Sequence, residues 1–533
     1  MTPEYDYVIV GAGSSGCLIA ERLSADPGTK VLLLEAGGEA NTFLLRLPVG
    51  YYRTMFDPRT SRTFETEAEE GTAGRRIKWP RGRIVGGSSA INGLIWIRGD
   101  SRVYDRWGER GATGWSAEEA TRLFRKVEAA PGPPSQRRGA HGMLKTSALR
   151  DRNPLAEAWM RAAESWGLPF TDDLAAEDGP AVGRSELSIH GRWRMSSARA
   201  FLGPARHRPN LDVMTGALAR RVILENGRAR GVEWLEGPAT RKAHAAREVI
   251  LCAGALQTPQ LLQLSGLGPA ETLRKAGIEV VADRPEIGGN LQDHYQMRLV
   301  LRMKDRRSLN LQMRDPLWMA KAALDWALFA KGPLTIGAGQ IGAAARTKHA
   351  PGDWPDVQFM GMPFSTDSPG KPAHPFSGFT SVVWQCHPDS TGRIDVVSDD
   401  PRADPRIRPN YLATERDRAT IVEGVRMLRE FHARSPFADL LDAEVSPGPG
   451  VDSDADILDA VRRTASTVYH PCGTARMGSD EAAPVDPRLR VRGVEGLRVA
   501  DASVMPEVPA ANINAPTMMV AEKAAEMIRA DAA

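Results

Sequence analysis

Residues 7–16 read Tyr-Val-Ile-Val-Gly-Ala-Gly-Ser-Ser-Gly, an apolar run followed at once by glycines at positions 11, 13 and 16. This spacing, placed between a strand and a helix, is typical of a turn that binds a dinucleotide. Gly11 permits the tight turn, Gly13 lets the backbone approach a pyrophosphate, and Gly16 lets the helix pack closely on its strand. The free N–H groups at the start of that helix would point at the phosphates.

An acidic residue at the end of the next apolar run supports this interpretation. Residues 31–34 read Val-Leu-Leu-Leu and are followed by Glu35, about 20 residues beyond the last glycine. At that distance a carboxylate can accept hydrogen bonds from ribose hydroxyls. A chance glycine turn in another α/β protein is the alternative, but the strand, the helix and the acid together favour a bound adenine dinucleotide.

Length and charge narrow the class of protein. The 533 residues are too many for one simple core and predict two or three domains. The 69 basic and 66 acidic side chains leave a net charge of +3, which gives no reason to expect a nucleic acid as partner. The cysteines are scattered without a CxxC pair, so we expect neither a disulfide framework nor a metal site. They are Cys17, Cys252, Cys386 and Cys472.

Nothing in the sequence resembles a signal peptide or a membrane span. Acidic residues precede the first strand, and no apolar run approaches the ~18 residues that a spanning helix needs. We therefore expect a cytoplasmic protein, with peripheral contact at the inner face of the membrane left open. Residues 317–330 (LWMAKAALDWALFA) predict a helix. We favour a partly buried core helix, with a channel wall, a lid or a membrane-surface helix as alternatives.

Three strands far apart in the sequence predict one nucleotide-binding domain. Beside the N-terminal segment, residues 248–252 form an apolar run that ends in Ala-Gly-Ala, and residues 497–501 read Leu-Arg-Val-Ala-Asp. Strands that stop at such turns suit a parallel sheet with its ligand at the carboxyl edge. The segments between them must then form an inserted domain. Alternating runs at residues 381–384 and 393–396 predict antiparallel strands there.

The predicted fold is therefore α/β with two domains. Residues 1–150, 196–294 and 461–533 would form a Rossmann-like dinucleotide-binding domain, and residues 151–195 and 295–460 a substrate domain built on an antiparallel sheet with helices. Residues 453–456 (Ser-Asp-Ala-Asp) have the form of a capping box after a Pro/Gly-rich break at residues 446–450. They predict the start of a helix that carries Ile457, Leu458 and Val461 on one face.

Three further clusters carry a resemblance to a known family. The first runs from Pro80-Arg81-Gly82 through GGSSAING at residues 86–93, and the second is GALQTP at residues 254–259 with SGLGP at residues 265–269. The third is YHPCGTARMG at residues 469–478, followed by VADASVMP at 499–506 and NINAPT at 512–517. With the N-terminal glycines, these motifs resemble the glucose–methanol–choline (GMC) oxidoreductases, in order from residue 5 to about residue 530. Within that family the chain is most similar to the choline-dehydrogenase-like and alcohol dehydrogenase branch.

The resemblance implies bound FAD, two-electron oxidation of an alcohol, and a substrate domain over the reactive face of the flavin. It implies that His470 is the catalytic histidine and Asn514 its partner. It also implies that residues 86–92 lie beside the flavin ring and that the backbone of Val222 contacts the adenine. The predicted FAD-binding residues are Gly11, Gly13, Ser14, Ser15, Gly16, Glu35, Ala36, Arg81, Gly87, Ser88, Asn92, Gly93, Leu94, Ile95, Val222, Ala253, Tyr469, Asp501, Ala502, Asn512, Asn514 and Thr517.

The residue types suit this chemistry independently. Oxidation of an alcohol requires loss of the hydroxyl proton and transfer of a hydride to flavin N5. A neutral imidazole such as that of His470 can accept the proton near pH 7, because its ordinary pKa is about 6.5. The amide of Asn514 can hold the same oxygen without competing for the proton. We therefore predict that a primary alcohol, aliphatic or aryl, is oxidised to an aldehyde, with oxygen, a quinone or a carrier protein as electron acceptor.

Other interpretations of single residues stay open. A lone histidine is often structural, Asn514 could be a helix cap, and His294 is expected to be structural. Cys472 is interpreted as small buried packing, and the serines of the flavin loop as hydrogen-bond donors, because no GxSxG motif surrounds them. That loop has no histidine to attach a flavin, so FAD is expected to be non-covalent.

Three alternative functions remain for the whole chain. A lyase resembling hydroxynitrile lyases and a light-driven fatty-acid decarboxylase would use the same scaffold, and a flavin-binding protein would have no catalysis. The substrate pocket is not defined by any motif. Its candidate residues are Trp318, Phe359, Met360, Phe364 and Trp384.

Overall fold

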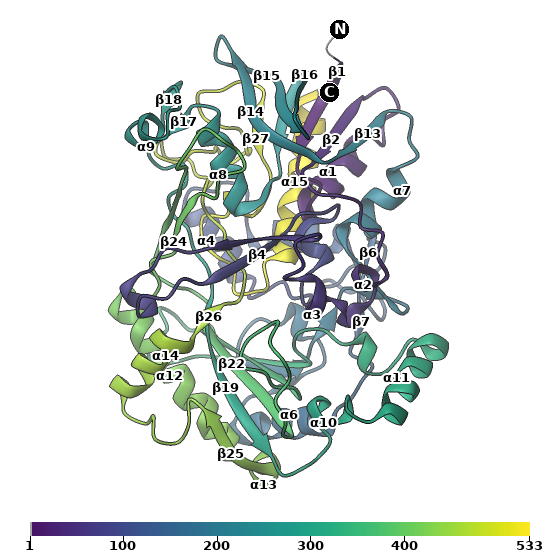
Figure 1. Cartoon of the computed structure of the whole chain (residues 1–533), viewed down its shortest axis with the longest axis vertical. Helices are drawn as coiled ribbons and strands as arrows, with labels where there is room; N and C mark the ends of the chain where they lie inside the picture. The colour runs from purple at the N-terminus through teal and green to yellow at the C-terminus, as the bar shows by residue number, and fades with distance from the viewer. Residues whose placement is uncertain (1–2, 533) are drawn as a thin grey trace.

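The computed structural model describes residues 3–532, and its two large sheets lie toward opposite ends of the molecule (Figure 1). The first sheet has the strand order β13-β2-β1-β16-β15-β14, with β27 beside β16. Strands β13, β2, β1, β16 and β27 are parallel, so their carboxyl ends meet at one edge. The strands are β13 (Leu211–Thr215), β2 (Val31–Glu35), β1 (Glu4–Val10), β16 (Ala239–Leu251), β15 (Arg228–Glu236), β14 (Ala217–Glu225) and β27 (Leu497–Val499).

This sheet confirms the predicted α/β class, because the expected strands lie side by side in it. The apolar run of β2 is buried throughout, as it must be in a parallel sheet covered on both faces. Helix α1 (Ser14–Leu23) follows β1 directly and packs against α15 (Asn514–Ala532), so the two ends of the described chain meet at one face of the sheet. Their packing brings both helix N-termini to the carboxyl edge.

The second sheet is mainly antiparallel and has the order β25-β19-β22-β21-β20-β9-β8, with β26 beside β19. Alternate residues of β19 are buried in a core with α6 (Pro154–Trp166) and α12 (Glu415–His432), whereas Gln296 and Arg298 face the other way. The strands are β25 (Leu441–Ser446), β19 (Tyr295–Met303), β22 (Gly378–Gln385), β21 (Val357–Met362), β20 (Ile341–Ala345), β9 (Ala181–Arg184), β8 (Phe170–Thr171) and β26 (Ser466–Thr467). All but β26 fall within residues 151–195 and 295–460, and the predicted domain boundaries stay predictions.

Several smaller elements connect these layers. The hairpin β3 (Ser61–Glu65) and β4 (Lys78–Gly82) leads into the glycine-rich loop that follows it. Helix α8 (Gly254–Leu264) follows β16 at the carboxyl edge. Helices α4 (Arg102–Glu109), α5 (Ala117–Val127) and α9 (Ala270–Lys275) lie outside the two sheets. The capping box is confirmed, because Ser453 Oγ accepts the N–H of Asp456 at 3.1 Å where α14 (Asp454–Thr464) begins.

Helix α11 (Pro316–Phe329) forms where the sequence predicts a helix, but it is not a core helix. It projects from the side of the second sheet, and Ala322 is the buried residue on it (Figure 1). Leu317, Leu324 and Phe329 are 81%, 55% and 61% exposed. The sequence misleads here because apolar residues surround almost the whole helix, which is typical of buried helices. No helix in residues 3–532 is both long and apolar enough to cross a membrane.

Candidate active site

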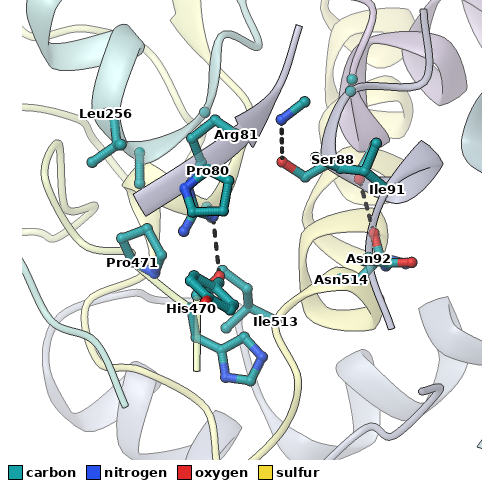
Figure 2. Close-up of a pocket in the computed structure, with 18 of the residues that line it drawn as sticks. Pro80, Arg81, Ser88, Ile91, Asn92, Leu256, His470, Pro471, Ile513 and Asn514 are labelled. Carbon is teal, nitrogen blue, oxygen red and sulfur yellow. Dashed lines mark hydrogen bonds between the residues drawn. The ribbon is translucent and has the colours of Figure 1, made fainter. Parts of the chain in front are cut away.

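A long cavity lies between the two sheets, with residues of both in its walls. At one end it is lined by Glu35 at the carboxyl end of β2, and in the middle by Gly13 and Gly87. At the other end it is lined by His470 and Asn512 together with residues of β19, β21 and β22, and Figure 2 shows His470 there. A cavity of this course suits an elongated dinucleotide whose far end meets the second sheet.

The Glu35 end fits an adenosine ribose. One carboxylate oxygen accepts the N–H of Ala12 at 3.0 Å and the other accepts that of Gly37 at 2.8 Å. Burial raises the pKa of Glu35 to about 7, although both backbone donors act in the opposite direction. Each oxygen retains a lone pair, so a ribose diol can donate to it and favour the ionised form.

The glycine turns in the middle of the cavity fit a pyrophosphate. Gly87 has φ +52°, and a Cβ on it would lie 2.7 Å from the Cα of Gly13, so the two loops touch with no side chain between them. Ser15 Oγ, in the first turn of α1, is buried without a hydrogen-bond partner among residues 3–532. The two glycine loops without side chains between them, the N-terminus of α1 and the unpartnered hydroxyl of Ser15 form a cradle for phosphate oxygens.

Twenty-one of the predicted site residues, His470 included, line this cavity, and two do not. Gly16 serves packing, because a Cβ there would lie 1.9 Å from the carbonyl oxygen of Gly11. Val222 is buried in β14 and its N–H donates to Ser265 Oγ at 2.8 Å. Val222 does not line the cavity, and its contact with the adenine stays a prediction. A bulge between Ala219 and Arg221 shifts the strand register, and it is the start of β14, residues 217–219, that lines the cavity.

A network around Asp293 fixes the backbone that carries His470. Tyr469 has φ +68°, a strained conformation for a bulky residue. Its N–H donates to Thr467 Oγ1 at 2.6 Å, and its carbonyl accepts from Arg81 Nη1 at 3.0 Å (Figure 2). Asp293 accepts the N–H of His470 at 2.8 Å and the hydroxyl of Thr467 at 2.6 Å. Asp293, which directly precedes His294 in the sequence, had no predicted role.

A chain of hydrogen bonds fixes the tautomer of His470. His294 Nε2 lies 3.1 Å from the carbonyl oxygen of Cys386, and its Nδ1 lies 3.0 Å from His470 Nδ1. A carbonyl can only accept, so His294 carries its proton on Nε2 and accepts at Nδ1 when neutral. His470 must then donate from Nδ1, which leaves the lone pair on its Nε2. His294, expected to be structural, is therefore the residue that positions this lone pair.

Burial keeps both rings neutral. It lowers the pKa of His294 to about 3 and that of His470 well below its ordinary value, with the neighbouring imidazole and Arg81 acting in the same direction on His470. The Nε2 of His470 is accordingly unprotonated at neutral pH. It accepts from the Nδ2 of Asn512 at 3.1 Å, and the Oδ1 of Asn512 is buried without a partner among the described residues.

The predicted pairing of His470 with Asn514 is not what the structure shows. Asn514 Oδ1 accepts the hydroxyl of Ser14 at 2.8 Å, which ties the start of α15 to the start of α1. Figure 2 shows its side chain apart from His470. Because α15 begins at Asn514, the helix fixes the direction of that side chain. Asn512, in the extended segment before the helix, reaches His470 instead.

The two asparagines are expected to respond differently to substitution. Asn512→Ala removes the donor beside His470 Nε2, so kcat/KM for an alcohol should fall about 10- to 100-fold while FAD stays bound. Asn514→Ala removes the bond to Ser14 at the cofactor end, so its larger effect should be on the Kd for FAD. Stopped-flow reduction and FAD titration measure the two quantities. The reverse assignment of effects would contradict the geometry.

The rate of alcohol oxidation should depend little on pH around the ordinary pKa of histidine. Because burial lowers the pKa of His470, its base form persists as the pH falls from about 8 to about 6, where an exposed imidazole would be mostly protonated. Anaerobic flavin-reduction rates measured across this range test the expectation. A midpoint at pH 6.5 or above would contradict it.

Acid should lower the free energy of unfolding, because buried neutral histidines resist protonation in the folded chain. His294 and His432 are buried with pKa values of about 3. Below about pH 6.5 the unfolded chain binds their protons and the folded chain does not, so stability is lost as pH falls toward 3. The kinetic series should therefore be accompanied by thermal melts at each pH.

The face of the second sheet closes the substrate end of the cavity. Of the candidate pocket residues, Met360, Phe364 and Trp384 line it. Phe359 points to the opposite face, where its ring lies 5.6 Å from that of Phe431, and Trp318 lies on α11 outside the cavity lining. Alternation along β21 explains the difference between Phe359 and Met360. Gln296 and Arg298, which no motif indicated, also line the cavity.

Comparison with known proteins agrees with this arrangement. Two models of the GMC oxidoreductases match residues 5–296 and 388–521. The chain is 38% identical to human mitochondrial choline dehydrogenase over 99% of this chain and 90% of that protein. It is equally 38% identical to an alcohol dehydrogenase [acceptor] of Pseudomonas putida, over 98% and 95%.

A solved structure of formate oxidase from Aspergillus oryzae RIB40, a variant studied for its effect on FAD modification, superposes over 99% of both chains with a TM-score of 0.92 and 26% identity. The cavity of the present chain is lined by Glu35, Gly13 and Ser15, whose geometry fits the ribose and pyrophosphate of such a cofactor, and by His470. The chain belongs to the GMC oxidoreductase family and is an FAD-dependent oxidoreductase that acts on CH–OH groups.

Proposed function

We propose that this protein oxidises a primary alcohol, aliphatic or aryl, to an aldehyde, with His470 as the base and Asn512 as the group that holds the hydroxyl oxygen. The observation that carries the proposal is the free lone pair on His470 Nε2, fixed by His294 and placed 3.1 Å from the Nδ2 of Asn512. The names of the human and Pseudomonas relatives, which denote dehydrogenases of alcohols, support the same reaction class.

The two side chains complement the two roles of a hydroxyl group. The O–H of the alcohol donates to His470 Nε2, and its oxygen accepts from Asn512 Nδ2, which replaces the bond that these atoms make with each other. His470 takes the proton as the C–H bond breaks, and Asn512 stabilises the charge that develops on oxygen. When bound, FAD supplies the acceptor for the hydride.

The start of α15 adds a favourable charge environment. Asn514 and Thr517 of its first turn line the cavity near Ser14 of α1. Helix N-termini carry partial positive charge, so this end of the cavity favours groups that become electron-rich. The placement agrees with a site in which an oxidised ring gains electrons from substrate.

FAD is proposed to be held without a covalent bond. The loop between Gly86 and Gly93, where the flavin ring is expected, contains no histidine, and no cysteine stands in its place. Precipitation with acid should therefore release the yellow colour into the supernatant. Colour retained in the pellet would contradict the proposal.

Helix α11 is proposed to touch the surface of an anionic membrane. Its exposed apolar side chains include Leu317, Leu324 and Phe329, and Arg314 and Lys331 flank its two ends. Apolar residues flanked by basic ones suit a surface of anionic lipid headgroups. Co-sedimentation with phosphatidylglycerol vesicles, lost in Leu324→Asp, tests the contact, and equal behaviour of both proteins would contradict it.

An anaerobic screen of primary alcohols tests the reaction directly. Bleaching of the flavin by an aliphatic or aryl alcohol, with the aldehyde as product, is the expected result. Reoxidation by air or by a quinone then identifies the acceptor. A holoprotein that no primary alcohol reduces, but that cleaves a cyanohydrin or decarboxylates a fatty acid in light, would overturn the proposed function.

A further inference from the structure

An unpaired arginine lies in the substrate end of the cavity. Arg298 is on the cavity face of β19, and its Nη2 donates to the carbonyl oxygen of Thr366 at 3.3 Å. Its Nε is buried without a hydrogen-bond partner, and no carboxylate among residues 3–532 lies within ion-pair distance of it. Among the other buried arginines, Arg98 pairs with Glu128, whereas Arg81 and Arg194 donate to backbone carbonyl oxygens.

Charges around this arginine leave it uncompensated. The acidic residues that line the cavity are Glu35 and Asp501, and both belong to the cofactor end. Asp367 is the carboxylate whose charge raises the pKa of Arg298, but its side chain bonds His374 at 2.9 Å and is 86% exposed. Tyr469, which also lines the cavity, is acted on by the positive charges of both Arg298 and Arg81.

A buried guanidinium without a counter-ion destabilises the protein unless an anionic ligand pairs with it. Burial lowers the pKa of Arg298, which shows that its charged form lacks enough stabilising partners in the protein alone. Removing a charge from water costs several kcal/mol, which a paired counter-ion with good hydrogen bonds can offset. The planar fork of a guanidinium matches two oxygens of an anion such as a carboxylate.

The position of Arg298 relative to His470 defines what such a ligand looks like. His294, which contacts His470, directly precedes β19, and Arg298 lies on that strand four residues after His294. In extended backbone, four residues span about 13 Å between the Cα atoms of His294 and Arg298. A molecule that reaches both must carry its hydroxyl at one end and its anionic group several bonds away. Between them, Val382 and Met360 offer an apolar wall, and Gln296 is the polar neighbour.

We propose that Arg298 binds the carboxylate of the alcohol substrate, so that the enzyme prefers hydroxy acids to neutral alcohols and rejects cationic ones. This inference rests on the proposed oxidation of alcohols and names the substrate class. A quaternary ammonium alcohol such as choline would place its cation against Arg298, and the described residues supply no carboxylate at that end of the cavity to receive it.

The test compares substrates of one length that differ in charge. The holoenzyme is mixed anaerobically with ω-hydroxyhexanoate, with α,ω-hexanediol and with ω-hydroxyhexyl-trimethylammonium, and with the aryl pair para-(hydroxymethyl)benzoate and its methyl ester. Flavin reduction should show a kcat/KM about 100-fold higher for the carboxylates than for the neutral partners, and lowest for the cation.

Variants then assign the preference to one side chain. Arg298→Gln should reduce the ratio of acid to neutral substrate toward one, chiefly through KM, and Arg298→Lys should restore part of it. Arg302→Gln is the matched control, because Arg302 lies four residues along the same strand, outside the cavity lining, and pairs with Asp442. It should keep the ratio of the wild-type enzyme. Inhibition by hexanoate, measured on wild-type enzyme, gives a second readout that needs no variant.

The outcomes separate this inference from the proposed function. Bleaching by the diol as readily as by the hydroxy acid, or a ratio unchanged in Arg298→Gln, would overturn the anion site and leave alcohol oxidation intact. Absence of bleaching by every alcohol would instead overturn the function. A ratio that favours the acid, weakened by Arg298→Gln and not by Arg302→Gln, together with inhibition by hexanoate, supports the site.

Discussion

Replacement of His470 by alanine should lower the rate constant of flavin reduction by an alcohol about 1000-fold, within the range known for loss of a general base. The imidazole Nε2 is the one atom beside Asn512 that can take the hydroxyl proton. Its neighbours cannot replace it, because His294 Nε2 is committed to the carbonyl of Cys386 and its Nδ1 faces away from Asn512. Stopped-flow measurement under anaerobic conditions gives the rate constant.

The same variant should keep its flavin. The loop that carries residue 470 is held by its backbone N–H on Asp293, which alanine retains. The imidazole itself bonds His294 and Asn512, not the glycine turns of the cofactor end. FAD content per chain should therefore match the wild-type value. His244→Ala is the control, since that ring lies on β16 outside the cavity and bonds the carbonyl of Arg230. A His470→Ala enzyme of undiminished rate would remove His470 from the mechanism.

Much of the cofactor half of the site could be predicted because its chemistry depends on backbone and on fixed spacing. Gly13 and Glu35 are a short distance apart in sequence, on elements whose type is evident from apolar runs. Local structure therefore positions both residues: Gly13 lies in the turn before a helix, and Glu35 lies at the end of a strand. His470 could be recognised because the motif around it is long.

The substrate half depends on details that the sequence does not display. Asn512 and Asn514 are two residues apart, and only the exact start of α15 decides which of them meets His470. The role of His294 depends on its hydrogen bond to the carbonyl oxygen of Cys386, the residue that follows β22. The proposed role of Arg298 depends on the fact that no carboxylate from the described residues lines the substrate end of the cavity. Contacts between distant segments, not local pattern, determine each of these cases.

The exposed helix α11 illustrates the opposite error. Its composition is that of a buried helix, and composition cannot tell a core from a surface that something else covers. The fold places it at the side of the second sheet, where Trp326 packs on Phe43 and Trp193 but Leu317, Leu324 and Phe329 stay mostly exposed. The same composition therefore predicts a core helix from the sequence, whereas the structure shows a helix with several exposed apolar side chains.

Replacement of Gly16 by alanine should nearly abolish FAD binding, with an increase of about 100-fold or more in Kd. A Cβ at this position would lie 1.9 Å from the carbonyl oxygen of Gly11, a backbone atom that no side-chain rotation can move. Helix α1 would have to shift by about 1 Å or more from β1 to restore van der Waals contact. Because α1 also packs on α15, the shift would displace both helix starts that line the cavity.

The expected loss separates a packing glycine from one that touches the cofactor. Gly16 does not line the cavity, so any effect on FAD must pass through the position of α1. Gly38→Ala is the matched control, because a Cβ there meets open space and its φ is not in the left-handed region. FAD titration of the two apoproteins, with thermal melts of each, should show weak binding and a lower Tm for Gly16→Ala alone. Equal Kd values in the two variants would show that close packing of α1 on β1 does not position the phosphate-binding turn.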